Sequence, residues 1–190
     1  DEAMVSFYND VKGRMSALGR RPEGCAVMAS LDLIVAETES IAREKQAYIN
    51  ELATAEQGLA TLSFVLGVDF STFPLDQPIA DMDINEGSRG MLDVILRGSG
   101  AESMTLRQTA KHYAVVPFTP QVVGTPSQVA DQLQHWFEIG GCDGYLVNPT
   151  TFPGTFEQVV RMLVPELQRR GLFRTEYSHK TMRDTVISGE

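Results

Sequence analysis

The side chains that could do chemistry in this sequence lie inside or just after strand-like runs. Asp32 interrupts the apolar run Cys25–Ala36, and Asn148, Thr150 and Phe152 end or follow a second such run. A carboxylate inside an apolar strand is costly unless it is paired or faces a solvated cavity. In a βα barrel, ligands meet the loops at the carboxyl ends of the strands. We therefore predict that these four residues line a substrate pocket, with Phe152 as an apolar wall.

His112 is a fifth pocket candidate, near the end of a helix predicted over Met104–Tyr113. A structural explanation stands beside each of these predictions. A histidine in the last helical turn also interacts well with the helix dipole, and a turn around Pro149 and Pro153 uses the same polar residues without any ligand. No residue is predicted to act as a nucleophile or as a proton donor.

Familiar catalytic and binding signatures are missing from the sequence. It has no GxGxxG, P-loop, GxSxG or HExxH motif. Its 2 cysteines and 3 scattered histidines suggest neither a disulfide framework nor a metal site. The net charge of -9 argues against nucleic-acid binding. No apolar run approaches the roughly 20 residues that span a bilayer, so a cytoplasmic protein without a membrane partner is predicted.

The elements that would position the candidates alternate between strand and helix, most clearly over Val122–Tyr177. Thr125, followed by proline and by glutamine three residues later, is typical of a capped helix start. Asp143–Asn148 is typical of a short buried strand, and Thr155–Gln158 repeats the capping-box spacing before the last helix. This alternation predicts an α/β fold with a parallel sheet covered by helices.

Upstream, a long insertion separates further helices. The stretch Gly67–Gly87 contains two prolines, several acidic residues and no helical period. Such long irregular connections are often lids or binding loops, so we predict an ordered lid, held down by Phe70 and Phe73 over the carboxyl ends of the strands. Apolar periodicity predicts the remaining helices over Glu2–Leu18, Thr38–Leu52, Leu59–Leu66 and Gly90–Leu96.

Several stretches resemble one enzyme family. They are Phe7–Lys12, Leu18–Arg20, Phe73–Pro78, Val123–Pro126, Gln128–Asp131, Asp143–Tyr145, Pro153–Phe156 and the long run Val164–Tyr177. The sequence in these stretches is similar to that of the flavin-dependent monooxygenases grouped around nitrilotriacetate and dibenzothiophene-sulfone monooxygenase, in the bacterial luciferase-like superfamily. The likeness covers nearly the whole chain and places it in the C-terminal half of such enzymes.

The resemblance implies a partial TIM (β/α)8 barrel: residues 1–190 form its C-terminal part, and residues 56–114 form an insertion or lid region. It implies that the full-length enzyme uses reduced FMN, supplied by a separate flavin reductase, and O2 to oxidise a small organic substrate. It further implies a homo-oligomer. The family's flavin contacts lie upstream, so cofactor-binding and catalytic residues are not assigned. This chain alone is expected to be inactive and not to close a barrel.

Two alternatives remain open from the sequence. One is a non-catalytic remnant or interaction domain derived from the same barrel. The other is a barrel enzyme of the same superfamily that uses a deazaflavin. Upstream sequence continuing into further βα units would favour the monooxygenase over the remnant. Nothing in the chain identifies the substrate.

Overall fold

The computed structural model describes residues 1–84, 87–97, 103–115 and 118–187. The chain divides into two compact units: Asp1–Arg43 together with Gln121–Glu190, and Glu44–Pro120. The insertion predicted over residues 56–114 falls within the range of the second unit. Residues 85–86 and 98–102 of that insertion lie outside the described residues.

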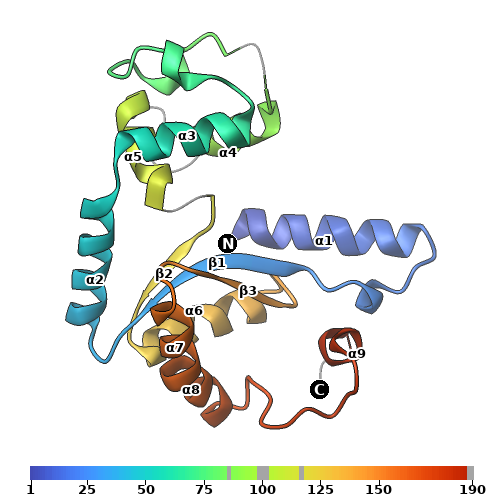
Figure 1. Cartoon of the computed structure of the whole chain (residues 1–190). Coiled ribbons are helices and arrows are strands. Elements are labelled where there is room, and N and C mark those ends of the chain that lie inside the picture. Colours follow the sequence, from blue (N-terminus) through green and yellow to red (C-terminus); the bar gives the residue numbers. More distant parts are fainter. Residues whose placement is uncertain (85–86, 98–102, 116–117, 188–190) are drawn as a thin grey trace. The chain divides into compact units, whose positions relative to one another are not determined.

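The first unit is built on a parallel sheet, as predicted. Its described strands are β1 (Met28–Val35), β2 (Gln121–Gly124) and β3 (Gly144–Pro149), in the order β2-β1-β3. The strand predicted from Cys25 begins three residues later, because the Asp143 carboxylate accepts the backbone N–H of Val27 at 2.7 Å, ahead of the first ladder pair. Helices lie against the strands (Figure 1), so the chain has the α/β fold that the alternation predicts.

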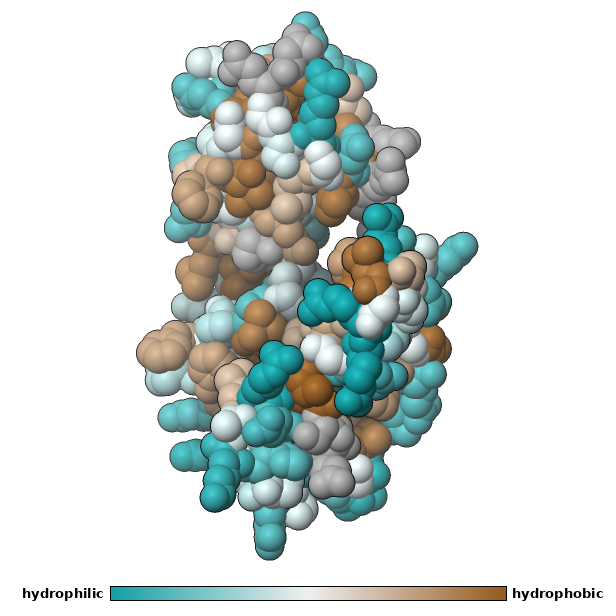
Figure 2. Space-filling model, turned by 90° about the vertical axis from the view of Figure 1, so that its right-hand side faces the viewer, coloured by the Kyte–Doolittle hydropathy of each residue, from teal (hydrophilic) through white to brown (hydrophobic). Residues whose placement is uncertain are grey.

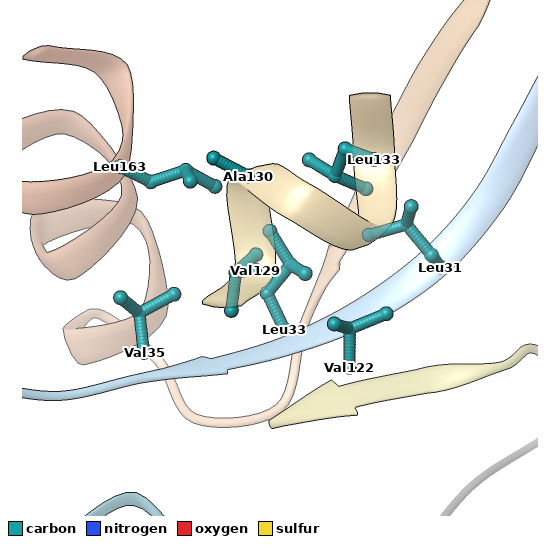
Figure 3. Close-up of a cluster of buried hydrophobic side chains, with 8 residues drawn as sticks. All are labelled: Leu31, Leu33, Val35, Val122, Val129, Ala130, Leu133 and Leu163. Carbon is teal, nitrogen blue, oxygen red and sulfur yellow. The ribbon is translucent and has the colours of Figure 1, made fainter. Parts of the chain in front are cut away.

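One face of this sheet forms the core of the first unit. Leu31, Leu33 and Val35 of β1 are at most 1% exposed and pack against α6 (Pro126–Glu138). Figure 3 shows these side chains on the same side of the strand, pointing toward Val129 and Leu133 of α6. Successive side chains on a strand point to opposite faces. The intervening residues of β1 therefore point to the face away from α6.

The α6 helix begins as the sequence predicts. Thr125 Oγ1 accepts the backbone N–H of Gln128, and the Gln128 side chain accepts the backbone N–H of Thr125. The predicted repeat of this capping box at Thr155 is wrong. Helix α7 (Gly154–Gln158) already includes Thr155, whose buried hydroxyl instead accepts the N–H of Thr151 at 3.0 Å. The helix therefore begins before Thr155 and not after it.

The last helical stretch contains a wider turn. After α7 the chain forms a π-helical turn over Val159–Leu163 and then α8 (Val164–Arg169). Arg170 fastens this end to α6, because its guanidinium donates to Asp131 at 2.6 Å and to Ser127 Oγ at 2.9 Å. Hydrogen bonds from Arg169 and Arg170 lower the pKa of Glu166 to about 2. The described chain ends with α9 (Met182–Ile187).

Helix α1 (Glu2–Ala17) is joined to the amino end of the strands. Lys12 Nζ lies 2.8 Å from Asp143 Oδ2 and donates to the Cys25 carbonyl at 2.6 Å. Tyr8 donates its hydroxyl to Asp143 Oδ1 at 2.8 Å. Burial raises the pKa of Asp143, but the bonds from Lys12, Val27 and Tyr8 outweigh it and lower that pKa. Contacts at the amino ends of barrel strands usually contribute to stability and not to catalysis.

The second unit is helical. It contains the end of α2 (Glu39–Leu52), then α3 (Ala55–Leu66), α4 (Arg89–Arg97) and α5 (Leu106–Val115). Thr105, whose spacing to Gln108 predicts a cap, accepts the N–H of Gln108 at 3.3 Å, so helix α5 begins just after it at Leu106. Gly58 of α3 lies so close to α5 that a Cβ there would be 1.7 Å from the Ala110 carbonyl oxygen. The two helices therefore touch backbone to backbone.

The segment predicted as a lid packs within the second unit. Its described part contains two short 3-10 turns, Phe70–Thr72 and Ile79–Asp81. Phe70 is fully buried, and its ring lies 5.6 Å from that of Phe73. Arg107 of α5 holds the segment from outside through Asp76 at 2.9 Å. Whether this segment acts as a lid stays a prediction.

Candidate functional site

Three polar side chains stand level with one another across the sheet. Asp32 in β1 pairs in register with Gln121 in β2 and with Asn148 in β3. The neighbours Leu31, Val122 and Val147 all belong to or pack on the helix-facing core. Alternation therefore puts Gln121, Asp32 and Asn148 on the other face of the sheet, the one that faces the interior in a barrel. We call these three residues the polar row.

The polar row is held in place by contacts within the chain. The Asn148 amide donates to Ser30 Oγ at 2.9 Å, which fixes its orientation on the face. Asp32 is 3% exposed and interacts with other groups of the chain. A fixed row of amide and carboxylate groups can orient a ligand by hydrogen bonds, and a buried carboxylate can also repel one.

Two of the candidates at the end of β3 differ sharply in their surroundings. The Thr150 hydroxyl donates to the Leu33 carbonyl at 3.2 Å and lies 3.0 Å from Thr155 Oγ1. These contacts tie the turn to β1, so the threonine has a clear structural role. Phe152 is 82% exposed in this chain. A single exposed aromatic ring is compatible with an incomplete pocket wall but does not define one.

His112 belongs to the second unit, whereas the other four candidates belong to the first. It is exposed, and its ring lies edge-on to Tyr113 at 5.1 Å. Tyr113 in turn stacks on Phe118 at 4.7 Å, and burial raises the pKa of the Tyr113 hydroxyl. The structure thus brings Asp32 and Asn148 together in one row, while a pocket role for His112 stays a prediction.

Gln121 and Ser30 are the neighbours that sequence reasoning missed. Both types of residue are common in ordinary strands, and neither belongs to a motif. The signal lies in the strand register, which places Gln121 beside Asp32 and Ser30 next to Asn148. Periodicity within one strand predicts its two faces, but it does not say which residue of another strand stands opposite.

The carboxyl ends of the strands lack the groups that a flavin phosphate needs. A flavin phosphate needs cations or free helix N–H groups. The loops after the three strands, residues 36–38, 124–125 and 150–153, contain no lysine or arginine. The first turn of α6 is closed by Thr125, and Thr38 accepts the N–H of Ile41 at the start of α2. These loops therefore do not fit a flavin phosphate. That the flavin contacts lie upstream of this chain stays a prediction.

Two further classes of site are absent from the parts of the chain that the structure covers. Across residues 1–84, 87–97, 103–115 and 118–187, no three His, Cys, Asp or Glu side chains gather as they would around a metal ion. Over the same ranges, no helix has the length and apolar character required to cross a membrane.

The chain is similar to known proteins over almost its whole length, although no protein-family model matches it. It is 35% identical over 187 residues to dibenzothiophene-sulfone monooxygenase from Rhodococcus erythropolis, which covers 96% of this chain and 41% of the relative. It is 38% identical over 181 residues to nitrilotriacetate monooxygenase component A from Aminobacter aminovorans, covering 94% of this chain and 40% of the relative. The chain thus spans about two fifths of the length of these relatives.

Solved structures also match this chain over nearly its whole length. DmoA from Hyphomicrobium sulfonivorans superposes with a TM-score of 0.84 at 25% identity, over 98% of this chain and 39% of that one. The long-chain alkane monooxygenase LadA superposes with a TM-score of 0.76 at 27% identity, over 97% of this chain and 38% of that one. The fold of both units therefore has a counterpart in longer proteins.

Proposed function

Because the chain resembles the dibenzothiophene-sulfone and nitrilotriacetate monooxygenases over nearly its whole length, we propose that it is the C-terminal portion of a flavin-dependent monooxygenase. The observation that carries the proposal is the combination of this likeness with the polar row. Sequence similarity alone would also fit a non-catalytic remnant domain that has retained the packing of the barrel but not its activity. A few polar groups placed on an otherwise apolar face are typical of ligand pockets.

A partial barrel would account for the exposure of this sheet face at β3. Strands of a β/α barrel are buried on both faces. Leu146, next to the polar row on β3, is instead 59% exposed. Figure 2 shows one side of the molecule, on which hydrophobic and hydrophilic residues are mixed. The relatives are longer than this chain by more than half their own length, which is enough for the remaining strands and helices.

The cofactor proposed for the complete protein is reduced FMN, delivered by a separate flavin reductase. When bound, it would supply two electrons to O2, so that one oxygen atom enters a small organic substrate and the other leaves as water. The residues of this chain would contribute positioning and exclusion of water. Asn148, fixed by Ser30, would orient the substrate, and Phe152 would close an apolar side of the pocket. We also retain the expectations of a cytoplasmic homo-oligomer and of an inactive isolated chain.

The test is a turnover assay with the complete protein. It combines that protein with an NADH-driven flavin reductase, FMN and a panel of sulfones, alkanes and aminopolycarboxylates. The measurement is O2 uptake and an oxygenated product that depend on the substrate. We expect a product with at least one class, and none with the 190-residue chain alone. Oxidation of no class by a folded complete protein would favour the non-catalytic remnant.

A further inference from the structure

The stretch of chain that follows α8 exposes a group of large apolar side chains. Residues 171–181, between α8 and α9, form neither helix nor strand (Figure 1). Leu172 and Phe173 are exposed there, Tyr177 is 78% exposed, and Met182 at the start of α9 is exposed as well. Single exposed apolar residues are normal in soluble proteins, whereas a group of them marks an interaction site.

Three of these neighbours form a fixed cluster, which we call the tail surface: Phe173, Arg174 and Tyr177. The Arg174 guanidinium lies 4.9 Å from the centre of the Phe173 ring and 5.4 Å from that of Tyr177. The Gln168 amide of α8 donates to the Arg174 carbonyl at 2.8 Å, which holds the backbone of this stretch against the helix. The tail surface is therefore arranged before any partner binds.

The Arg174 side chain still has donors to offer. Across residues 1–84, 87–97, 103–115 and 118–187, no carboxylate forms an ion pair with it. A guanidinium that stacks on aromatic rings keeps the N–H groups at its edge available for a carboxylate or for carbonyl oxygens. The tail surface thus combines two exposed rings with an unused set of hydrogen-bond donors.

The position of α8 indicates what lies beside this surface. On one side, Arg170 at the end of α8 donates to Asp131 of α6 at 2.6 Å. The helix follows β3, the last described strand of the chain. In a closed ring of eight βα units, the last helix also lies beside the first unit. The relatives are longer than the part aligned with this chain by more than half of their own length, which leaves room for that first unit.

We propose that the tail surface is the docking site for the part of this same protein that precedes Asp1. The proposal uses from the proposed function only that such a part exists, and not the chemistry. The segment that docks presents apolar side chains to Phe173 and Tyr177, and a carboxylate or backbone carbonyls to Arg174. Aromatic and arginine side chains often carry most of the energy of an interface once they are buried. The run Val164–Tyr177, which has no part in the candidate pocket, gains a role in this way.

The experiment is photo-crosslinking in the complete protein. Tyr177→p-benzoylphenylalanine places the reactive group in the tail surface, and mass spectrometry of the digested product identifies the peptide to which it attaches. We expect attachment to a residue that precedes Asp1, within one polypeptide chain. Tyr48→p-benzoylphenylalanine is the matched control, because Tyr48 of α2 is also an exposed tyrosine but lies outside the tail surface. It should not attach to the same segment.

Two variants measure the strength of the contact. Tyr177→Ala and Arg174→Ala each remove one member of the tail surface, and Tyr48→Ala is again the control. Hydrogen exchange of the complete protein is followed by mass spectrometry. In both tail variants, exchange in the segment that the crosslink identifies should become at least about tenfold faster. In Tyr48→Ala the exchange of that segment should not change.

Four outcomes would overturn the proposal: attachment to a second copy, seen as a crosslinked dimer on a denaturing gel; attachment only within residues 1–190; no attachment; or unchanged exchange in both tail variants. If a tail variant does not fold, the crosslink decides. Anaerobic binding of reduced FMN is measured in parallel. A protein that docks as expected but does not bind reduced FMN contradicts only the monooxygenase function, whereas one that binds it without this docking contradicts only the present proposal.

Discussion

The two units of the chain reach stability by different means. The first places β1 between two parallel neighbours and covers one face with α6, and its remote segments are joined by charged contacts such as that between Lys12 and Asp143. The second has no strand ladder among its described residues and depends on apolar packing and on the backbone contact between Gly58 and Ala110. A substitution in one unit should therefore lower the stability of that unit, by an amount that depends on whether charged contacts or apolar packing is lost.

The largest effect is expected at the contact between α3 and α5. In Gly58→Ala the new Cβ would meet the Ala110 carbonyl at 1.7 Å, and the backbone there has no flexible end that could move aside. We expect a loss of about 3 kcal/mol in the stability of the second unit. Hydrogen exchange measured by mass spectrometry should show faster exchange in α3 and α5 and little change in β1.

Gly13→Ala is the matched control for this change. No atom lies within 4 Å of a Cβ built at Gly13, which is inside α1. The substitution should stabilise that helix by about 0.5–1 kcal/mol, because alanine is the better helix former. Equal exchange in α3 and α5 of Gly58→Ala and of the unmodified chain would contradict the backbone contact.

In the first unit the corresponding change is at Asp143. Asp143→Asn removes the negative charge that pairs with Lys12 and accepts the Tyr8 hydroxyl. The partly buried Lys12 ammonium then has no carboxylate beside it at this position. We expect a loss of about 2 kcal/mol, seen in the urea midpoint and in faster exchange of α1. Asp10→Asn, at an exposed pair, should cost less than about 0.5 kcal/mol. An equal effect of the two changes would mean that the Lys12–Asp143 contact is no stronger than a surface pair.

The same contact predicts how stability depends on pH. The pKa of Asp143 is lowered in the folded state, so its stabilisation is present above the ordinary value of 3.8 and is lost as pH falls through the lowered pKa. The pKa of Lys12 is raised, so its stabilisation is present below 10.5 and is lost as pH rises through the raised pKa. Urea unfolding followed by circular dichroism from pH 2 to 11 should show both losses, and both should shrink in Asp143→Asn.

A smaller effect is expected at two helix caps of the same kind, one in each unit. Thr125 in the first and Thr54 in the second each form a capping box with a glutamine three residues later. Replacing either threonine by alanine should cost about 1 kcal/mol. Hydrogen exchange should rise in α6 for Thr125→Ala and in α3 for Thr54→Ala. Exchange that rises in both units for either change would contradict their description as separate compact units.

Local sequence signals predicted more of the first unit than of the second. The alternation of strand and helix, the cap at Thr125 and the buried run of β1 follow from rules that act within a few residues. The close approach at Gly58 does not, because a glycine in a helix has no sequence mark that tells a contact from a weak point.

The candidate site shows the same limit. Asp32 and Asn148 stand out as polar residues in apolar strands, whereas Gln121 became a neighbour only through the register. The error at Thr155 arose because capping-box spacing does not fix which turn a threonine occupies; here its hydroxyl closes the turn against Thr150 and Thr151. Contacts between segments distant in the sequence decided both cases.

The central claim, that this chain is part of a flavin-dependent monooxygenase, is tested most directly by binding of the cofactor to the complete protein. The measurement is an anaerobic titration of reduced FMN, followed by calorimetry and by flavin fluorescence, with oxidised FMN and the 190-residue chain as comparisons. We predict saturable binding of reduced FMN by the complete protein, tighter than that of oxidised FMN, and no binding by the 190-residue chain. A folded complete protein with no affinity for reduced FMN would contradict the claim.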